Sequence, residues 1–170
     1  MLRRHAALYS AILLLLSATL LSAMIPGGPV ETRDFSHYDP LLLGSFNTFL
    51  TVLGLASYGA AWFVMRRRRW ALISAQLCGA GYFLVYAADL AQLFPQSPLA
   101  MPAALLVMEI TGLVVSLPLM LLPALAGHSE LSVSNGHRQL TSTALLLITA
   151  VTVLAVGIIA FATRAASGHG

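Results

Sequence analysis

Five long stretches with few or no charged residues alternate with short polar segments along the chain. Each has at least the roughly 20 residues that an α-helix needs to cross about 30 Å of hydrocarbon. The prolines and glycines of the polar segments favour helix ends and turns. The pattern predicts an all-α integral membrane protein, a bundle of five transmembrane helices in a single polytopic domain covering residues 1–170. The expected spans are residues 6–25, 41–65, 70–93, 102–126 and 140–163.

The first stretch has a second interpretation, because it follows Arg3 and Arg4 and ends near the small residues Ser22 and Ala23. A basic start, an apolar core and small residues before a cut are the marks of a secretory signal peptide. Cleavage after Ala23 would leave four helices. The apolar run is longer than most signal cores, and Leu21 is a poor residue at the −3 position, so we expect a retained helix.

The fourth stretch contains three prolines with different consequences. Pro102 suits the first turn of a helix, where its missing N–H has no partner to lose. Pro118 and Pro123 lie inside the stretch, and each removes a backbone donor. We therefore expect the second half of this helix to bend, with neighbouring helices stabilising the bend.

The composition agrees with a membrane protein. Of the residues, 58% are hydrophobic and 9% are charged, whereas about a quarter are charged in ordinary soluble domains. The basic residues are all arginines, and most stand at the ends of apolar stretches, as topology signals do. Basic surface scattered over a soluble domain would instead indicate nucleic-acid binding. We therefore expect a lipid bilayer, and no nucleic acid, around this chain.

The arginines divide unequally between the two sides of the expected bundle. If the amino terminus is cytoplasmic, Arg33 and Arg164 lie outside and the other seven of the 9 basic residues lie inside. The positive-inside rule therefore predicts a multi-pass protein of the cell membrane with an external carboxyl terminus. A run of four arginines would fix this topology and could also hold anionic lipid head groups. The run is Arg66, Arg67, Arg68 and Arg69.

Polar side chains recur at helical spacing on three of the expected helices. In the third, Tyr82, Tyr86 and Asp89 fall on one face, and Cys78 extends their line. The second-helix stripe is Asn47, Thr51, Gly54 and Tyr58, and the fourth-helix stripe is Glu109, Gly112 and Ser116. From the helix rise, Asn47, Tyr86, Asp89 and Glu109 lie roughly 6 to 10 Å inside the external boundary. We expect these stripes to face one another in one polar layer.

This polar layer has a functional and a structural interpretation. In the functional one it forms a pocket in the outer half of the bundle, with Glu109 as its ionisable centre and Asp89 at its mouth, because acids within a membrane are rare and costly. In the structural one Glu109 is a neutral tie between helices and Asp89 is an interfacial residue. For Tyr82, Tyr86 and Asn47, packing and interhelical hydrogen bonding are favoured over ligand contact. All five remain candidates for a ligand or proton site.

Four residues before the second helix could supply ligands to a divalent cation, namely Glu31, Asp34, His37 and Asp39. Their spacing matches no motif of defined geometry. We expect an ordinary solvated loop in which Arg33 pairs with a neighbouring acid. His128 and His137 flank another polar segment without a third ligand. No metal site is expected.

Several chemistries are missing from the sequence. No histidine lies within an expected span, there is no lysine, and Cys78 is the only cysteine. These absences exclude paired axial haem ligands, a retinal Schiff base and an intrachain thiol pair, so no cofactor is expected. The leading hypothesis is a non-enzymatic accessory or ligand-binding component, which packs against a membrane protein partner or a second copy, or holds a small apolar or cationic molecule. The alternatives are a proton-linked carrier using Glu109 and a lipid-modifying enzyme using Glu109 and Asp89 as acid and base.

Overall fold

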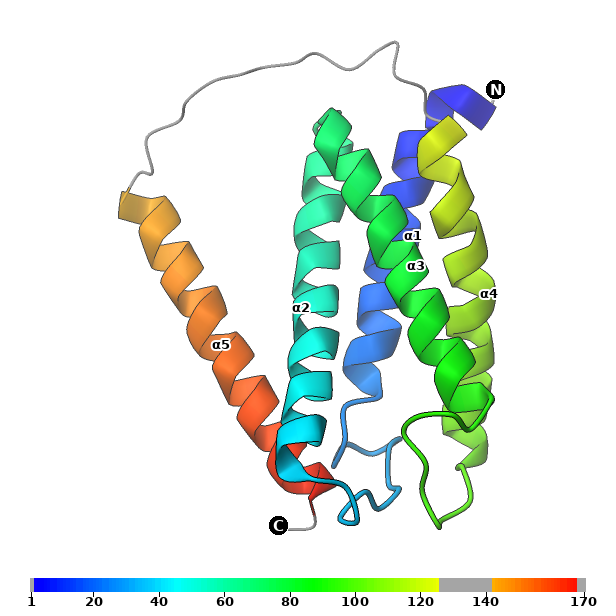
Figure 1. Cartoon of the computed structure of the whole chain (residues 1–170). Helices are drawn as coiled ribbons and strands as arrows, with labels where there is room; N and C mark the ends of the chain where they lie inside the picture. The colour runs from blue at the N-terminus through cyan, green and yellow to red at the C-terminus, as the bar shows by residue number, and fades with distance from the viewer. Residues whose placement is uncertain (1, 126–141, 168–170) are drawn as a thin grey trace.

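The computed structural model describes residues 2–125 and 142–167, and over these ranges the protein is all-helical (Figure 1). The helices are α1 (Leu2–Ala23), α2 (Pro40–Met65), α3 (Arg69–Leu90), α4 (Ala103–Leu125) and α5 (Ser142–Ala166). All five are long and apolar enough to cross a membrane. The expectation of five such helices in an all-α chain is therefore confirmed.

Local sequence explains where several helices begin and end. The Asp39 carboxylate accepts a hydrogen bond of 2.7 Å from a backbone N–H in the first turn of α2, and Pro40 occupies the first helical position. Arg67 has a positive φ of 56°, which ends α2 and turns the chain into α3. Gln92, with φ 52°, likewise follows the end of α3. For this reason α3 ends at Leu90, short of the expected residue 93.

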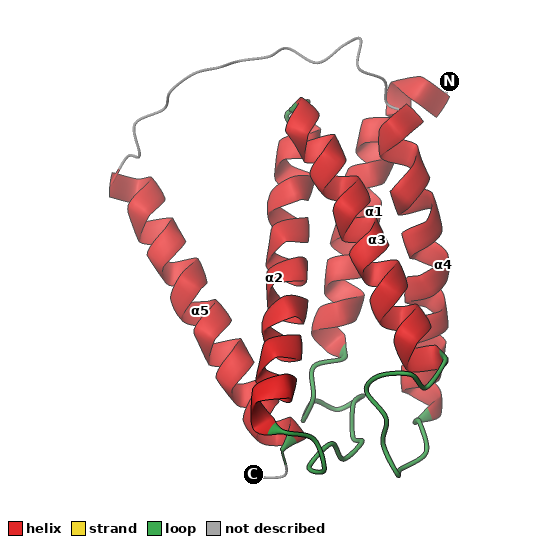
Figure 2. Cartoon of the chain, in the orientation of Figure 1, coloured by secondary structure: helices red, strands yellow, loops and turns green. Residues whose placement is uncertain are grey.

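Helices α1 to α4 form a four-helix bundle, and α5 stands beside it (Figures 1 and 2). Around the bundle α1 packs on α2, α2 on α3, α3 on α4 and α4 on α1, so that α2 and α4 occupy opposite corners. Among the described helices α5 packs on α2 alone. Figure 1 shows α5 close to α2 at the carboxyl-terminal end of α5 and diverging from it towards the start of α5.

The packing of α3 against α4 depends on glycine and tolerates two prolines. A Cβ atom on Gly112 would overlap the ring of Tyr86, so only glycine admits this ring between the helices.

Helix α4 runs through Pro118 and Pro123 as one continuous element. Gln76 of α3 donates a hydrogen bond of 3.2 Å to a backbone carbonyl between the two prolines. The neighbouring helix thus stabilises the proline-containing half, as a buried proline helix requires.

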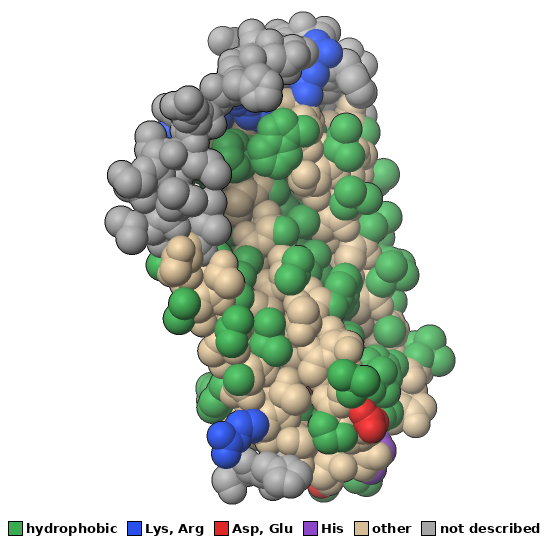
Figure 3. Space-filling view, turned by 60° about the vertical axis from the view of Figure 1, so that its left-hand side comes forward, with side chains coloured by type: hydrophobic (Ala, Val, Ile, Leu, Met, Phe, Trp, Pro, Cys, Tyr) green, Lys and Arg blue, Asp and Glu red, His purple; other side chains and the backbone are tan. Residues whose placement is uncertain are grey.

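The outer surface of the described helices is largely apolar. Figure 3 shows uncharged side chains across the middle of one face, with charged side chains near its two ends. Large apolar side chains are exposed on all five helices, for example Leu8, Val52, Leu84, Val107 and Val153. α5 is the least buried of the five. Apolar exposure on this scale is far beyond the patches found on soluble monomers and suits an apolar environment.

The two ends of the bundle carry different structures. The turn between α2 and α3, with its four arginines, lies at the end that we call the arginine end (Figure 1). The opposite end, which we call the capped end, is covered by segments 24–39 and 91–102. Two hydrogen bonds join these segments: the Gln96 backbone N–H donates to the Tyr38 hydroxyl at 2.9 Å, and the Ser97 hydroxyl donates to the Asp34 carbonyl at 3.0 Å.

Segment 24–39 is not the ordinary solvated loop that the sequence suggested. Glu31 is buried, and the side chain of Arg33 is 5% exposed. The other polar candidates of the segment, Asp34, His37 and Asp39, are exposed. The pKa of Asp34 lies below its ordinary value, because the carboxylate accepts hydrogen bonds from the backbone N–H and the hydroxyl of Ser36. The segment folds inwards because Arg33 finds acidic partners inside the bundle.

The carboxyl-terminal end of α5 is anchored at the capped end. Gly27 has φ 80°, and a Cβ atom there would lie 2.5 Å from the Cβ of Ala165, so both its backbone angle and its contact require glycine. The Asn47 amide of α2 donates a hydrogen bond of 3.3 Å to the Thr163 hydroxyl of α5. These contacts hold one end of α5 against the bundle.

Candidate functional site

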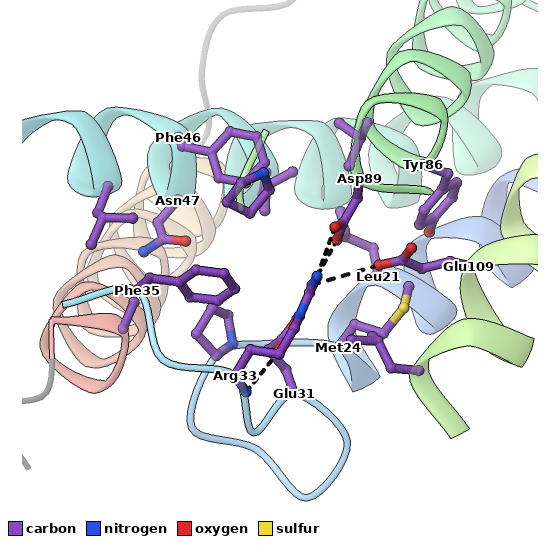
Figure 4. Close-up of a pocket in the computed structure, with 17 residues that line it drawn as sticks. Leu21, Met24, Glu31, Arg33, Phe35, Phe46, Asn47, Tyr86, Asp89 and Glu109 are labelled. Carbon is purple, nitrogen blue, oxygen red and sulfur yellow. Dashed lines mark hydrogen bonds and ion pairs between the residues drawn. The ribbon is translucent and has the colours of Figure 1, made fainter. Parts of the chain in front are cut away.

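Arg33 lies at the centre of a cluster of acidic side chains at the capped end (Figure 4). Its Nη1 and Nη2 donate to the two carboxylate oxygens of Asp89, each at 2.7 Å. Its Nε and Nη2 donate to the two oxygens of Glu31, at 2.9 and 2.6 Å. A planar guanidinium matches carboxylates in this paired manner, and such charge-assisted bonds are the strong ones. Arg33 therefore ties segment 24–39 to α3.

Glu109 of α4 is the third acid of the cluster and is held less firmly. Its Oε1 lies 3.8 Å from Arg33 Nη2, within ion-pair range but beyond hydrogen-bonding distance. Its Oε2 and the hydroxyl of Tyr86 are both buried, and neither has a hydrogen-bond partner among the described residues. Because most buried polar atoms have partners, these two atoms are the exceptions in this part of the described structure.

The charges of the cluster do not balance. Burial alone would lower the pKa of Arg33, but its hydrogen bonds and charge interactions with Asp89 and Glu31 outweigh burial and raise that pKa above its ordinary value. The guanidinium therefore stays charged at any physiological pH. Formally, three carboxylates face this one cation. The imbalance is relieved either by a proton on Glu109 or by an additional positive charge beside it.

A small cavity of about 50 Å³ adjoins the cluster. It has room for a few water molecules or a small cationic group. Four side chains that were expected to share one polar layer, Asn47, Tyr86, Asp89 and Glu109, all line it. Its apolar wall includes Leu21, Met24, Phe35 and Phe46 (Figure 4). The structure thus places four polar residues from three helices around one cavity, with Arg33 at its side.

The remaining tyrosines of the polar stripes lie away from this cavity. Tyr82 is deeper in the bundle, where its hydroxyl donates a hydrogen bond of 2.9 Å to Ser57. Tyr58 of α2 is 39% exposed, and its hydroxyl lies 3.5 Å from that of Thr19. The expectation that the whole second-helix stripe faces the polar layer is therefore wrong at Tyr58. The reason is that α2 packs through the face of Ser57, which points Tyr58 to the side.

The sequence suggested that Asp89 stands open at the mouth of the pocket, but the structure shows it covered. It is 7% exposed, and both of its carboxylate oxygens accept hydrogen bonds from Arg33. Its carboxylate is therefore a structural anion that positions Arg33. Glu109 is the acid that has an oxygen without a hydrogen-bond partner.

The four consecutive arginines lie at the arginine end, far from the acidic cluster (Figure 1). The guanidinium of Arg66 lies over the ring of Trp62, 4.6 Å from its centroid, in a cation–π contact. Trp62 is 56% exposed on the side of α2. This position of the arginines fits a role at a membrane boundary, and it is remote from the cavity.

Sequence reasoning expected Arg33 to pair with a neighbouring acid, as it does with Glu31, but it placed both residues in a solvated loop and not in the buried cluster. A usable signal was present, because Arg33 is one of only two arginines on the arginine-poor side. An arginine on the side that has few arginines, next to a layer of acids without partners, indicates that this arginine is buried and pairs with those acids.

The metal candidates gain no support from the geometry. In the described ranges, no group of three histidine, cysteine, aspartate or glutamate side chains is arranged to hold a metal ion. The three acids at the capped end surround the guanidinium of Arg33 instead. His128 and His137 lie outside the described residues.

Comparison with known proteins places the chain by family but not by activity. A family model described as a domain of unknown function (DUF8051) matches residues 6–168. No curated protein and no solved structure matches the chain.

Proposed function

Because the chain belongs to the DUF8051 family of domains of unknown function, we propose a function from the site itself. The protein is a small polytopic membrane protein that binds a small organic cation in the cavity at the capped end, with Glu109 as the binding anion. It acts as a binding component and not as an enzyme.

The membrane part of the proposal rests on the apolar helices and on the placement of the arginines. Five helices suffice in length and hydropathy, and the run of four arginines lies at the same end as the start of α1. The positive-inside rule then places the arginine end in the cytoplasm and the capped end outside. Ser36→Cys at the capped end should react with an impermeant thiol reagent on intact cells, and Arg67→Cys only after permeabilisation. The reverse pattern would overturn the orientation.

One observation carries the binding proposal: Glu109 Oε2 and the Tyr86 hydroxyl are buried at one cavity without partners, in a cluster where three acids face one guanidinium. An ammonium group has three donors and a compact positive charge. It could donate to both oxygens at once and improve the charge balance. A neutral or anionic ligand would leave the excess negative charge uncompensated.

The experiment is a calorimetric titration of ethylammonium into the protein in lipid nanodiscs, with ethanol as the uncharged analogue. Glu109→Gln keeps the shape of the side chain and removes the charge, and we expect it to weaken ethylammonium binding more than tenfold, because hydrogen bonds to charged groups contribute about 1.5–3 kcal/mol. Asp39→Asn is the matched control, since Asp39 is an exposed acid at the same end. Equal binding by native and Glu109→Gln protein, or equal binding of ethanol, would overturn the proposal.

A proton-linked carrier is the second candidate, favoured by the loose ion pairing of Glu109. The Glu109 carboxyl group lies 3.8 Å from the Arg33 guanidinium and has one oxygen without a hydrogen-bond partner, so a proton can reach it without breaking a close ion pair. Because uncharged ethylamine crosses the bilayer unaided, the probe in liposomes is methylguanidinium, which stays charged at neutral pH. Such a carrier would change the lumenal pH when a methylguanidinium gradient is imposed, and Glu109→Gln would abolish the change. Binding without any coupled proton movement would leave the binding component as the function.

The enzyme alternative has less support, although its two acids are close. Asp89 Oδ2 and Glu109 Oε1 lie 2.7 and 3.8 Å from the same nitrogen of Arg33. However, both oxygens of Asp89 accept hydrogen bonds from that guanidinium, which makes the carboxylate a fixed partner of Arg33.

A further inference from the structure

Beside the cavity at Glu109 there is a second, apolar cavity of about 70 Å³ between α1, α2 and α5. The two cavities share five lining residues, Leu21, Met24, Pro26, Asn47 and Leu50. These shared side chains form a common wall of the two cavities. The second cavity therefore extends the first one sideways, between helices, and not through the covered end of the bundle.

The second cavity is lined mainly by apolar side chains, although the Asn47 amide and the Tyr58 hydroxyl also belong to its wall. Its polar side chains include Ser22 and Thr51, whose hydroxyl groups donate to backbone carbonyls of their own helices at 2.8 and 2.7 Å. The rest of the wall is mainly aliphatic, with Ile25, Leu55 and Ile158. The aliphatic part of this wall suits a hydrocarbon chain.

The apolar space continues outwards because α5 diverges from the bundle. A wide groove of about 700 Å³ follows, which shares Ser22, Ile25 and Ile158 with the second cavity. Gly157 of α5 lines this groove, and a Cβ atom there would meet no atom within 4 Å. The groove runs along helix faces that, in a bilayer, would meet acyl chains. Figure 1 shows the divergence between α5 and α2 from which it arises.

From this series of adjoining spaces we infer that the ligand is a single-chain amphiphile with an ammonium head group, entering from the bilayer between α1, α2 and α5. The inference rests on the proposed function and names its ligand class. The head group lies against Glu109 and Tyr86, where negative charge is in excess, and the alkyl chain lies in the apolar cavity and groove. The polar head group thus lies beside charged side chains, and the alkyl chain lies beside mainly apolar ones.

The test is the dependence of affinity on chain length, measured with ethyl-, butyl- and hexylammonium against native protein in nanodiscs, with empty nanodiscs subtracted. We expect the dissociation constant to fall about three- to fourfold for each methylene group that enters the apolar cavity. Ethylammonium binding without any gain for the longer chains would overturn the inference and leave the proposed function intact. If none of the three alkylammonium ions bound, both the inference and the proposed function would be overturned.

A matched pair of variants on α2 shows where the alkyl chain of the ligand lies. Gly54 lines the apolar cavity, and a Cβ atom there would make only an ordinary contact of 3.8 Å with Leu21. Gly59 lines none of the cavities described, and a Cβ atom there would meet nothing within 4 Å. Gly54→Leu should abolish the chain-length gain while ethylammonium still binds, and Gly59→Leu should keep the gain. If Gly54→Leu kept the full gain, the chain would lie elsewhere and the inference would fail.

Discussion

Replacement of Arg33 by glutamine should destabilise the protein strongly, because Arg33 is the cation that pairs with the three acids of the buried cluster. Four hydrogen bonds of 2.6–2.9 Å join its guanidinium to the side chains of Asp89 and Glu31. Breaking a buried ion pair by removing one partner costs about 3–5 kcal/mol, since the other charge stays buried without compensation. We expect about 3 kcal/mol, the lower end, because the cluster lies near the end of the bundle.

The assay is reversible unfolding by sodium dodecyl sulphate in mixed micelles, followed by circular dichroism. Arg164→Gln is the control, since Arg164 is exposed at the same end and should change the free energy of unfolding by less than about 0.5 kcal/mol. Combining Arg33→Gln with Asp89→Asn should cost less than the sum of the two single changes, because the second removes the uncompensated charge left by the first. If Arg33→Gln and Arg164→Gln unfolded at the same detergent fraction, the buried cluster would be refuted.

Two further predictions concern the packing that supports the site. Gly112→Ala should cost about 1–3 kcal/mol by forcing its new methyl group against the Tyr86 ring, whereas Gly157→Ala, whose methyl group meets open space, should not destabilise; the same unfolding assay compares them. Tyr82→Phe should cost about 1 kcal/mol through loss of its buried hydrogen bond to Ser57, and unchanged ethylammonium binding would agree with its position away from the cavity.

Much of the architecture follows from patterns that are local in sequence. Apolar runs of sufficient length predict helices, and the periodicity of α3 correctly placed Tyr86 and Asp89 on one buried face. The rise of about 1.5 Å per residue then brought Asn47 and Glu109 to the same depth on other helices. The cavity that these four residues line was predictable because depth and face are both properties of a single helix.

The centre of the site could not be predicted in the same way. Arg33 lies in a segment with prolines, glycines and no periodicity, and its partner Asp89 is 56 residues away in sequence. No local rule links such residues, so local sequence supported only the pairing of Arg33 with a neighbouring acid. That expectation holds for Glu31, two residues away, but local sequence could not show that both are buried. The direction of Tyr58 was missed for a similar reason, since it depends on how α2 packs on α3.

The central claim is that a cation binds between Glu109 and Tyr86, and the most direct measurement is a structure determined in lipid with ethylammonium present. The account predicts density for the ammonium group in the capped-end cavity, within hydrogen-bonding distance of both Glu109 Oε2 and the Tyr86 hydroxyl. Density bound elsewhere, or a Glu109 Oε2 capped by another group of the protein at ethylammonium concentrations that saturate binding, would contradict it.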